Sequence, residues 1–174
     1  MPMMPASGDA ATKLEIAPLE PADWPSVRDA YAQGLESGLA TFETEIPGWE
    51  TWNVAFLPHS RWVARLDGRV VGWAALSAVS PRACYAGVAG ISVYVARDAR
   101  GRGVGRSLLQ ALVASSERHG IWTLQGMTIA GNESAMRLQS SCGFRLVGRR
   151  ERIARLRGEW RDILLTERRS RVVV

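Results

Sequence analysis

The feature that most constrains this chain is an arginine- and glycine-rich segment at residues 100–105, which reads Arg-Gly-Arg-Gly-Val-Gly. It follows an alternating apolar run at 89–95 that predicts a strand, and it precedes an amphipathic helix predicted over 107–119. A further strand is predicted at 121–129. Two strands joined through a helix pair in parallel by a crossover, so we expect the segment at the end of a strand in an α/β sheet.

The rest of the pattern predicts strands that pair antiparallel around this unit. Asp67-Gly68 is a strong hairpin signal between two apolar runs, and Asp23 is expected to cap the first helix. The remaining predicted elements are, in chain order, a strand at 13–17, a helix starting at Trp24, a helix at 49–57, strands at 61–66 and 70–76, a helix at 133–141, and strands at 144–155 and 159–166. These elements predict one mixed, strongly twisted sheet with helices on both faces.

The composition predicts one globular domain at 13–168, with a flexible leader at 1–12 and a C-terminal tail at 169–174. The leader lacks the basic and apolar stretches of a signal peptide, and no apolar run approaches the roughly 18 residues of a membrane span. We therefore expect a cytoplasmic protein. The two cysteines, Cys84 and Cys142, lack metal-like spacing, so we expect reduced thiols and no metal site.

The chain is basic, with a net charge of +5, and Lys13 is its only lysine. A basic chain suggests an anionic partner, either nucleic acid or a phosphate-rich small molecule. The arginines of residues 145–171 are interleaved with acidic residues, which favours a solvated surface of mixed charge over a nucleic-acid-binding face. We therefore expect neither nucleic acid nor a membrane as a partner.

The segment at 100–105 has the chemistry of a phosphate site. The first turn of a helix has backbone N–H groups without partners, and the helix dipole adds positive charge there. Glycines let the backbone approach an anion closely, and arginines add charged donors. The glycine spacing fits neither a dinucleotide-binding loop nor a Walker loop. A turn needed only for tight packing is the alternative, against which the three arginines argue.

The pattern Arg100-x-x-Gly103-x-Gly105 matches the R/Q-x-x-G-x-G/A signature of the GNAT superfamily of N-acetyltransferases. Over about residues 13–168 the chain also resembles the phosphinothricin and methionine sulfoximine acetyltransferase subgroup. The motifs that carry this resemblance are ATFETE at 40–45, VGWA at 71–74, SVYV at 92–95, NES at 132–134, CGF at 142–144 and GEWRD at 158–162. The resemblance implies the acyl-CoA N-acyltransferase (GNAT) fold, acetyl-coenzyme A as co-substrate, a small-molecule amine as acceptor, and a homodimer.

The resemblance also implies roles for individual residues. The coenzyme's pantetheine arm would pair with the backbone of the strand before the loop, and its pyrophosphate would lie on the loop. The cofactor-binding residues implied are Val93, Tyr94, Val95, Arg100, Gly101, Arg102, Gly103, Val104, Gly105, Arg106 and Asn132. For Asn132 the alternative role is the N-cap of the following helix. The acceptor residues implied are Phe42, Glu43, Trp73 and Arg82.

The chain departs from the subgroup at the catalytic base. Gly90 stands where the relatives have a glutamate, and Gln139 stands where they have a histidine. The acceptor amine could be neutral at working pH, another residue could serve as the base, or the protein could bind acetyl-coenzyme A with weak catalysis. Glu43, Glu45 and Tyr85, from loops expected to line the pocket, are candidates for this base, and of these Glu43 and Tyr85 are taken as the catalytic residues. We favour an enzyme that acetylates an amino acid or a similar molecule; a protein or peptide N-acetyltransferase is a further alternative.

Overall fold

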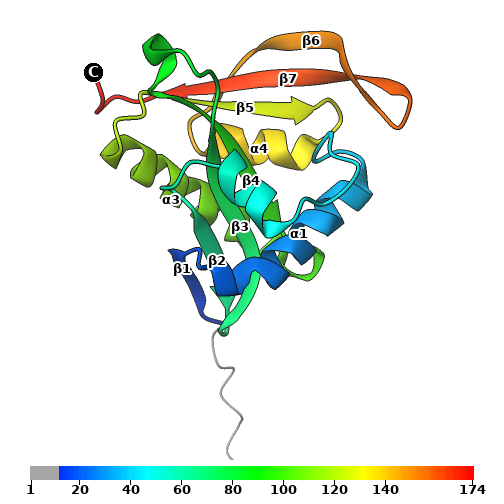
Figure 1. Cartoon of the computed structure of the whole chain (residues 1–174), viewed down its shortest axis with the longest axis vertical. Coiled ribbons are helices and arrows are strands. Elements are labelled where there is room, and N and C mark those ends of the chain that lie inside the picture. Colours follow the sequence, from blue (N-terminus) through cyan, green and yellow to red (C-terminus); the bar gives the residue numbers. More distant parts are fainter. Residues whose placement is uncertain (1–11) are drawn as a thin grey trace, which may run out of the picture.

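A computed structural model describes residues 12–174, so the expected leader lies outside the described residues except for Thr12. The order of elements predicted from the sequence is confirmed (Figure 1). The strands are β1 (Leu14–Pro18), β2 (Trp62–Leu66), β3 (Arg69–Ala78), β4 (Val88–Val95), β5 (Thr123–Ile129), β6 (Arg145–Leu156) and β7 (Glu159–Arg169). The helices are α1 (Trp24–Ser37), α2 (Trp49–Ala55), α3 (Val104–Arg118) and α4 (Glu133–Ser141), and 3-10 turns lie at Pro21–Asp23, Ala83–Tyr85 and Arg97–Ala99.

The strands form a seven-stranded sheet in the order β1-β2-β3-β4-β5-β7-β6. Every neighbouring pair is antiparallel except β4 and β5, which are joined through α3 and pair in parallel. The parallel pairing covers only Val88 with Thr123, Ala89 with Leu124 and Gly90 with Gln125. Beyond Gly90 the two strands separate. This divergence in the middle of the sheet opens its interior to a ligand.

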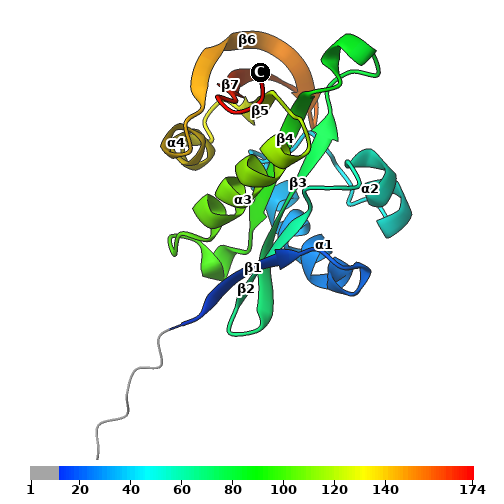
Figure 2. The same ribbon diagram turned by 90° about the vertical axis from the view of Figure 1, so that its left-hand side faces the viewer.

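The helices cover both faces of the sheet, as the sequence predicted (Figure 2). On one face α3 and α4 lie together, and Leu108, Leu109 and Leu112 of α3 are fully buried against the strands. On the opposite face α1 and α2 enclose an aromatic cluster that includes the buried Trp52 and Trp73. None of the helices in residues 12–174 is long and apolar enough to span a membrane.

Asp23 does not cap α1 as the sequence predicted. Its carboxylate accepts the Glu20 N–H at 3.0 Å and pairs with Arg65 at 2.7 Å, and it makes no hydrogen bond to the first turn of α1. A capping residue normally has an extended backbone, whereas Asp23 ends a 3-10 turn and has φ −78° and ψ −12°. The 3-10 turn that leads directly into α1 therefore directs this carboxylate to the turn and to β2.

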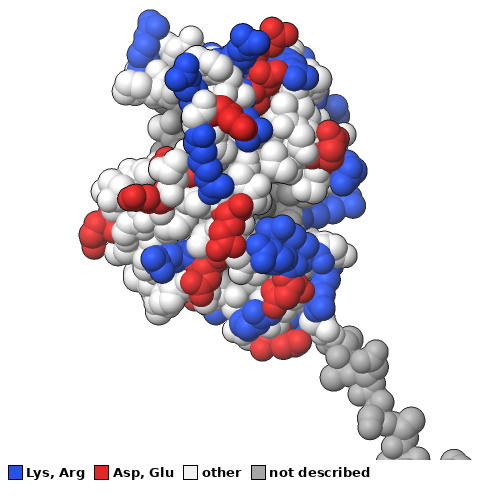
Figure 3. Space-filling view, turned by 90° about the vertical axis from the view of Figure 1, so that its right-hand side faces the viewer, with Lys and Arg blue, Asp and Glu red and all other residues white. Residues whose placement is uncertain are grey.

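The arginines of β6 and β7 carry the mixed-charge surface that the sequence predicted. Figure 3 shows acidic and basic side chains interspersed over one face of the molecule. The ion pairs within this hairpin join Arg145 to Glu167, Arg149 to Asp162, and Arg161 to Glu159.

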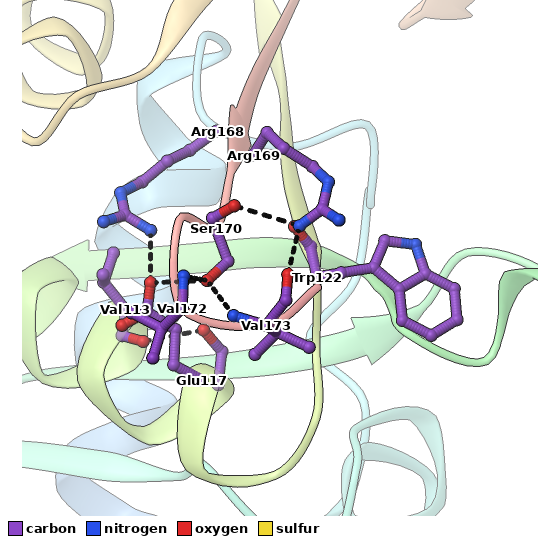
Figure 4. A network of polar contacts seen from close by, with 9 residues as sticks. Val113, Glu117, Trp122, Arg168, Arg169, Ser170, Val172 and Val173 are labelled. Atoms are coloured by element: carbon purple, nitrogen blue, oxygen red, sulfur yellow. Dashed lines mark hydrogen bonds and ion pairs between the residues drawn. The ribbon is translucent and has the colours of Figure 1, made fainter.

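The residues after β7 are attached to the domain through at least Val173 (Figure 4). Glu117 of α3 accepts hydrogen bonds from Arg168 at 3.0 Å and from the Ser170 hydroxyl at 2.9 Å. The guanidinium of Arg169 donates to the carbonyls of Trp122 at 3.0 Å and of Val173 at 2.7 Å. The segment expected to be a tail is thus bonded to α3 and to the start of β5.

Candidate active site

The arginine–glycine loop presents free backbone amides at the start of α3. Gly101 and Gly103 have φ of +74° and +78°, in the left-handed region that favours glycine. Gly103 is the N-cap of α3, and the Ser107 N–H donates to its carbonyl at 3.0 Å. The helix therefore begins three residues before the predicted position, and the N–H groups of Val104, Gly105 and Arg106 have no intrahelical partner. These three amides at a helix N-terminus are suited to an anion.

Gly105 lets the first turn of α3 pack closely on its neighbours. A Cβ at this position would lie 3.3 Å from Leu138 Cδ2 of α4 and 3.7 Å from Val95 Cγ2 of β4. The glycine thus serves packing, in agreement with the alternative reading of the loop, while Gly101 and Gly103 supply its backbone shape. The sequence could not separate these roles, because the contact with α4 depends on tertiary structure.

A cavity of about 550 Å³ opens beside this loop, within the size range of small-molecule and cofactor sites. It is bounded by the loop, the end of α1, the last residues of β4, and α4. Every cofactor-binding residue predicted from the sequence lines it except Arg102, which is exposed. Arg106 lines the cavity, and Arg100 also donates from Nε to the Val95 carbonyl at 3.1 Å. The donor set thus fits the phosphates of a coenzyme.

Val93, Tyr94 and Val95 lie in the part of β4 that β5 leaves unpaired. Their other side pairs with β3 through Ala74, Trp73 and Gly72. On the β5 side their backbone amides and carbonyls border the cavity instead of a strand. An extended chain bearing amides, such as pantetheine, can therefore add to this edge in the manner of a strand.

The Tyr94 side chain organises the wall between α1 and β4. Its ring stacks on Trp73, with ring centres 4.8 Å apart, and lies 4.8 Å from the ring of Tyr31. Its hydroxyl donates to the Ala40 carbonyl at 3.2 Å. Burial, with smaller effects from Tyr31 and Glu43, raises the pKa of Tyr94 far above its ordinary value. The hydroxyl therefore stays protonated and holds the loop after α1 in place.

Asn132 is the N-cap of α4. Its Oδ1 accepts the Ala135 N–H at 3.2 Å and the Ser134 hydroxyl at 3.0 Å, and its Nδ2 donates to the Leu39 carbonyl at 3.1 Å. Of the two roles considered from the sequence, the structure supports the capping role. The residue still borders the cavity, where one amide hydrogen is left for a ligand.

A second cavity of about 530 Å³ adjoins the first. The residues that the two cavities share are Leu39, Ala40, Val93, Tyr94, Asn132, Ala135 and Leu138. Its floor includes Ser77, Gly90 and Gln125, which are neighbours across β3, β4 and β5. Phe42 and Glu43 line it from the loop after α1, as predicted. The two cavities meet at Val93 and Tyr94, where the sheet divides.

The structure does not bring Trp73, Arg82 and Tyr85 to this second cavity. Trp73 is fully buried beneath Tyr94, because the alternation of β3 directs it into the aromatic cluster between α1 and α2. Arg82 and Tyr85 lie on the exposed turn between β3 and β4, where the guanidinium is 5.9 Å from the centre of the tyrosine ring. Trp73 and Arg82, predicted to contact the acceptor, and Tyr85, predicted as a catalytic candidate, therefore do not line this cavity.

The structure adds residues that the sequence did not single out. Gln125, Arg150, Ile153 and Ile163 line the second cavity from β5, β6 and β7. They reach it through cross-strand register, in which Arg150 is opposite Ile163. Register between distant strands has no local signal in the sequence, so pattern analysis could not find this wall.

Gln139 has a structural role. It is buried, its Nε2 donates to the Thr128 hydroxyl at 2.9 Å, and its Oε1 accepts the Thr166 hydroxyl at 2.6 Å. These bonds tie α4 to β5 and β7. With both ends of its amide engaged, Gln139 is not a free acid or base.

Gly90 leaves open space where the sequence comparison expects a glutamate. A Cβ there would be 3.2 Å from the Ser77 hydroxyl and would otherwise meet only the Ser77 carbonyl within 4 Å. A side chain at this position is therefore compatible with the backbone. The site lacks a carboxylate on β4 because of the residue type, and the surrounding structure does not prevent one.

Comparison with known proteins agrees with this geometry. The model of the acetyltransferase (GNAT) family matches residues 24–144. A phosphinothricin N-acetyltransferase of Alcaligenes faecalis is 34% identical over 156 residues, which cover 84% of this chain and 77% of that protein. An L-methionine sulfoximine/L-methionine sulfone acetyltransferase of Pseudomonas paraeruginosa is 31% identical over 155 residues, which cover 79% of this chain and 90% of that protein.

Among solved structures, a phosphinothricin acetyltransferase of the GNAT superfamily from Sinorhizobium meliloti, in complex with acetyl-CoA, superposes with a TM-score of 0.81. Its sequence is 25% identical, and the match covers 90% of this chain and 88% of that one. The sequence similarity extends over most of the chain. The structure has strands β4 and β5 that diverge beside the start of α3, where three backbone amides are free. The chain therefore belongs to the acetyltransferase (GNAT) family and is an acetyl-CoA-dependent N-acetyltransferase.

Proposed function

We propose that this enzyme transfers the acetyl group of acetyl-coenzyme A to the primary amine of an amino acid or a similar small molecule. The observation that carries the proposal is the pair of cavities that meet at Val93 and Tyr94. The first offers phosphate donors, and the second is a walled pocket of about 530 Å³, suited in size to a small acceptor. The named relatives act on phosphinothricin and on methionine sulfoximine or sulfone, which supports the same acceptor class here.

In the proposed reaction the acceptor amine attacks the thioester carbon directly. The thioester would lie at the junction of the cavities, so a backbone N–H of β4 near Val93 is placed to stabilise the negative charge that develops on its oxygen. Pantetheine pairing along Val93–Val95 would fix the acetyl group toward the second cavity. Holding two reactants in this orientation can by itself supply several kcal/mol of rate acceleration.

We propose Glu43 as the group that accepts the amine proton. It is the only carboxylate among the described residues that line the second cavity. Burial is the main cause that raises the pKa values of Tyr31 and Tyr94, so neither hydroxyl competes as a base. The other candidates, Glu45 and Tyr85, do not line the cavity, and 46% of the Tyr85 surface is exposed.

The test is steady-state release of coenzyme A thiol with a panel of amino acids, methionine sulfoximine and phosphinothricin. We expect turnover with at least one of them and a fall in kcat of about 100-fold or more for Glu43→Gln, the range of general-base catalysis. Glu45→Gln is the matched control, because Glu45 is exposed on the same loop but does not line the cavity. Tight acetyl-coenzyme A binding without turnover of any amine would contradict the proposal and favour a binding protein. Turnover confined to peptides would favour a protein acetyltransferase.

We also propose that the enzyme is a homodimer. Strands β5 and β6 expose apolar side chains, among them Leu146, Val147 and Met127, which is 63% exposed and also borders the second cavity. Burial of such side chains against a second copy would stabilise a dimer. Light scattering should give twice the mass of the chain, and a monomer at micromolar concentration would contradict this. The cytoplasmic location expected from the sequence stays a prediction.

A further inference from the structure

The second cavity contains one cation that the structure leaves without an anionic partner. Among the described residues that line it, only Glu43 and Arg150 carry a full charge. Within residues 12–174 no carboxylate lies within ion-pair distance of Arg150. Its neighbour Arg149, by contrast, pairs with Asp162 at 2.5 Å.

Arg150 is the last paired residue of β6 before a bulge. The pairing of β6 with β7 shifts register between Arg150 and Ala154, and Arg152 within the bulge has φ +46°. Asp162 of β7 secures the bulge, because it accepts the Arg152 N–H at 2.8 Å and Arg149 Nε at 2.7 Å. Arg149 thus neutralises Asp162, and Arg150 is left facing the cavity.

Arg150 and Gly90 stand at opposite ends of the cavity. Gly90 is in register with Gln125 of β5, while Arg150 is in register with Ile163 and, through it, with Ile129 of β5. Gln125 and Ile129 are four residues apart, which is roughly 13 Å along a strand. Val93 follows Gly90 in the same direction along β4, which is parallel to β5, so the guanidinium and the proposed point of acetyl transfer lie toward the same end of the cavity.

We propose that Arg150 binds the carboxylate of the acceptor and so selects α-amino acids over simple amines. The inference rests on the proposed function, in which the amine lies near Val93. A planar guanidinium binds a carboxylate through two parallel hydrogen bonds. Arg82, expected from the sequence near this carboxylate, does not line the cavity, and its guanidinium lies 5.9 Å from the ring centre of Tyr85.

The experiment compares two acceptors that differ only in the carboxylate, L-methionine sulfone and 3-(methylsulfonyl)propylamine. For Arg150→Ala we expect kcat/KM on the amino acid to fall about 10- to 100-fold, mainly through KM, as for loss of a charged hydrogen bond. For Arg150→Ala the kcat/KM on the amine without a carboxylate should change less than about threefold. On the amino acid, kcat/KM of Arg150→Lys should lie between those of the unaltered enzyme and Arg150→Ala, because an ammonium cannot form two parallel hydrogen bonds to a carboxylate. Arg155→Ala is the matched control, since Arg155 is on the same strand but lies 4.3 Å from the ring centre of Trp160 and does not line the cavity.

If Arg150→Ala lowered kcat/KM equally on both acceptors, or on neither, the assignment of Arg150 would be overturned while the proposed function would remain intact. Failure of the unaltered enzyme to turn over either acceptor would count against the proposed function instead. In that case calorimetric binding of L-methionine sulfone to the enzyme with coenzyme A decides the question for Arg150. Binding that Arg150→Ala and Arg150→Lys leave unchanged would overturn the inference, and a 10-fold or greater weakening by Arg150→Ala would support it.

Discussion

Replacement of Gly34 by alanine tests how closely α1 approaches β4 beside the coenzyme cavity. In an exposed helix this change stabilises by about 1 kcal/mol, because glycine is a poor helix former. Here the new Cβ would lie 2.6 Å from Tyr94 Cε1 and 2.7 Å from Cδ1, whereas carbon atoms in good contact are about 3.5–4.0 Å apart. Side chains and backbone must shift to accommodate such overpacking, which typically lowers the free energy of unfolding by about 1–3 kcal/mol. We therefore expect Gly34→Ala to lower the free energy of unfolding by about 0–2 kcal/mol in net terms.

A double-mutant cycle isolates the cause. In a Tyr94→Ala background the ring is absent, so Gly34→Ala should become stabilising by about 1 kcal/mol. The coupling between the two sites, measured by urea unfolding, should thus be about 1–3 kcal/mol. Displacement of the Tyr94 ring should also raise KM for acetyl-coenzyme A, because Gly34, Tyr94 and Ala40 all border that cavity. If Gly34→Ala stabilised the unaltered enzyme by about 1 kcal/mol, the close contact would be refuted.

Three further predictions follow from the site and the C-terminal segment. Gly90→Glu should restore turnover to the Glu43→Gln enzyme at least partly, because positions 90 and 43 line the same cavity and Ser77 is the only close neighbour of the new Cβ. An unchanged kcat would contradict this. Gln139→His should lower the free energy of unfolding by about 1–3 kcal/mol, since it disrupts a buried hydrogen-bonded pair, and should not raise kcat; a more active variant would count against the structural role. Partial burial acts to raise the pKa of Glu117, but hydrogen bonds from Arg168 and Ser170 outweigh it and hold the pKa below its ordinary value. The stability that this lowered pKa gives is complete above about pH 4.5 and is lost as the pH falls further. Glu117→Gln should therefore reduce the fall in melting temperature below that pH, and a fall as steep as in the unaltered enzyme would exclude the effect.

Local patterns in the sequence identify what local chemistry determines. The loop at 100–105 could be predicted to bind phosphate from the sequence. Its signals, which are glycines suited to a left-handed backbone and the start of a helix, all come from residues next to one another in the chain. The hairpin turn at Asp67-Gly68 follows from the same kind of signal. The chain order of the helices and strands is likewise carried by periodicity within each segment.

The residues that line the second cavity could not be predicted in the same way. Arg150 lines it from a position opposite Ile163, beside a bulge that Asp162 secures from another strand. Trp73 has the residue type of a pocket wall, but its position on β3 places it beneath Tyr94. In both cases the outcome depends on register and on packing between segments far apart in the chain.

A crystal structure with coenzyme A bound tests the central claim most directly. The pyrophosphate should accept hydrogen bonds from the amides between Gly101 and Arg106, and the pantetheine amides should pair with the backbone of Val93–Val95. The thiol should point toward the cavity that contains Glu43 and Arg150. A coenzyme bound outside the divergence of β4 and β5, or with its thiol directed away from that cavity, would contradict the account.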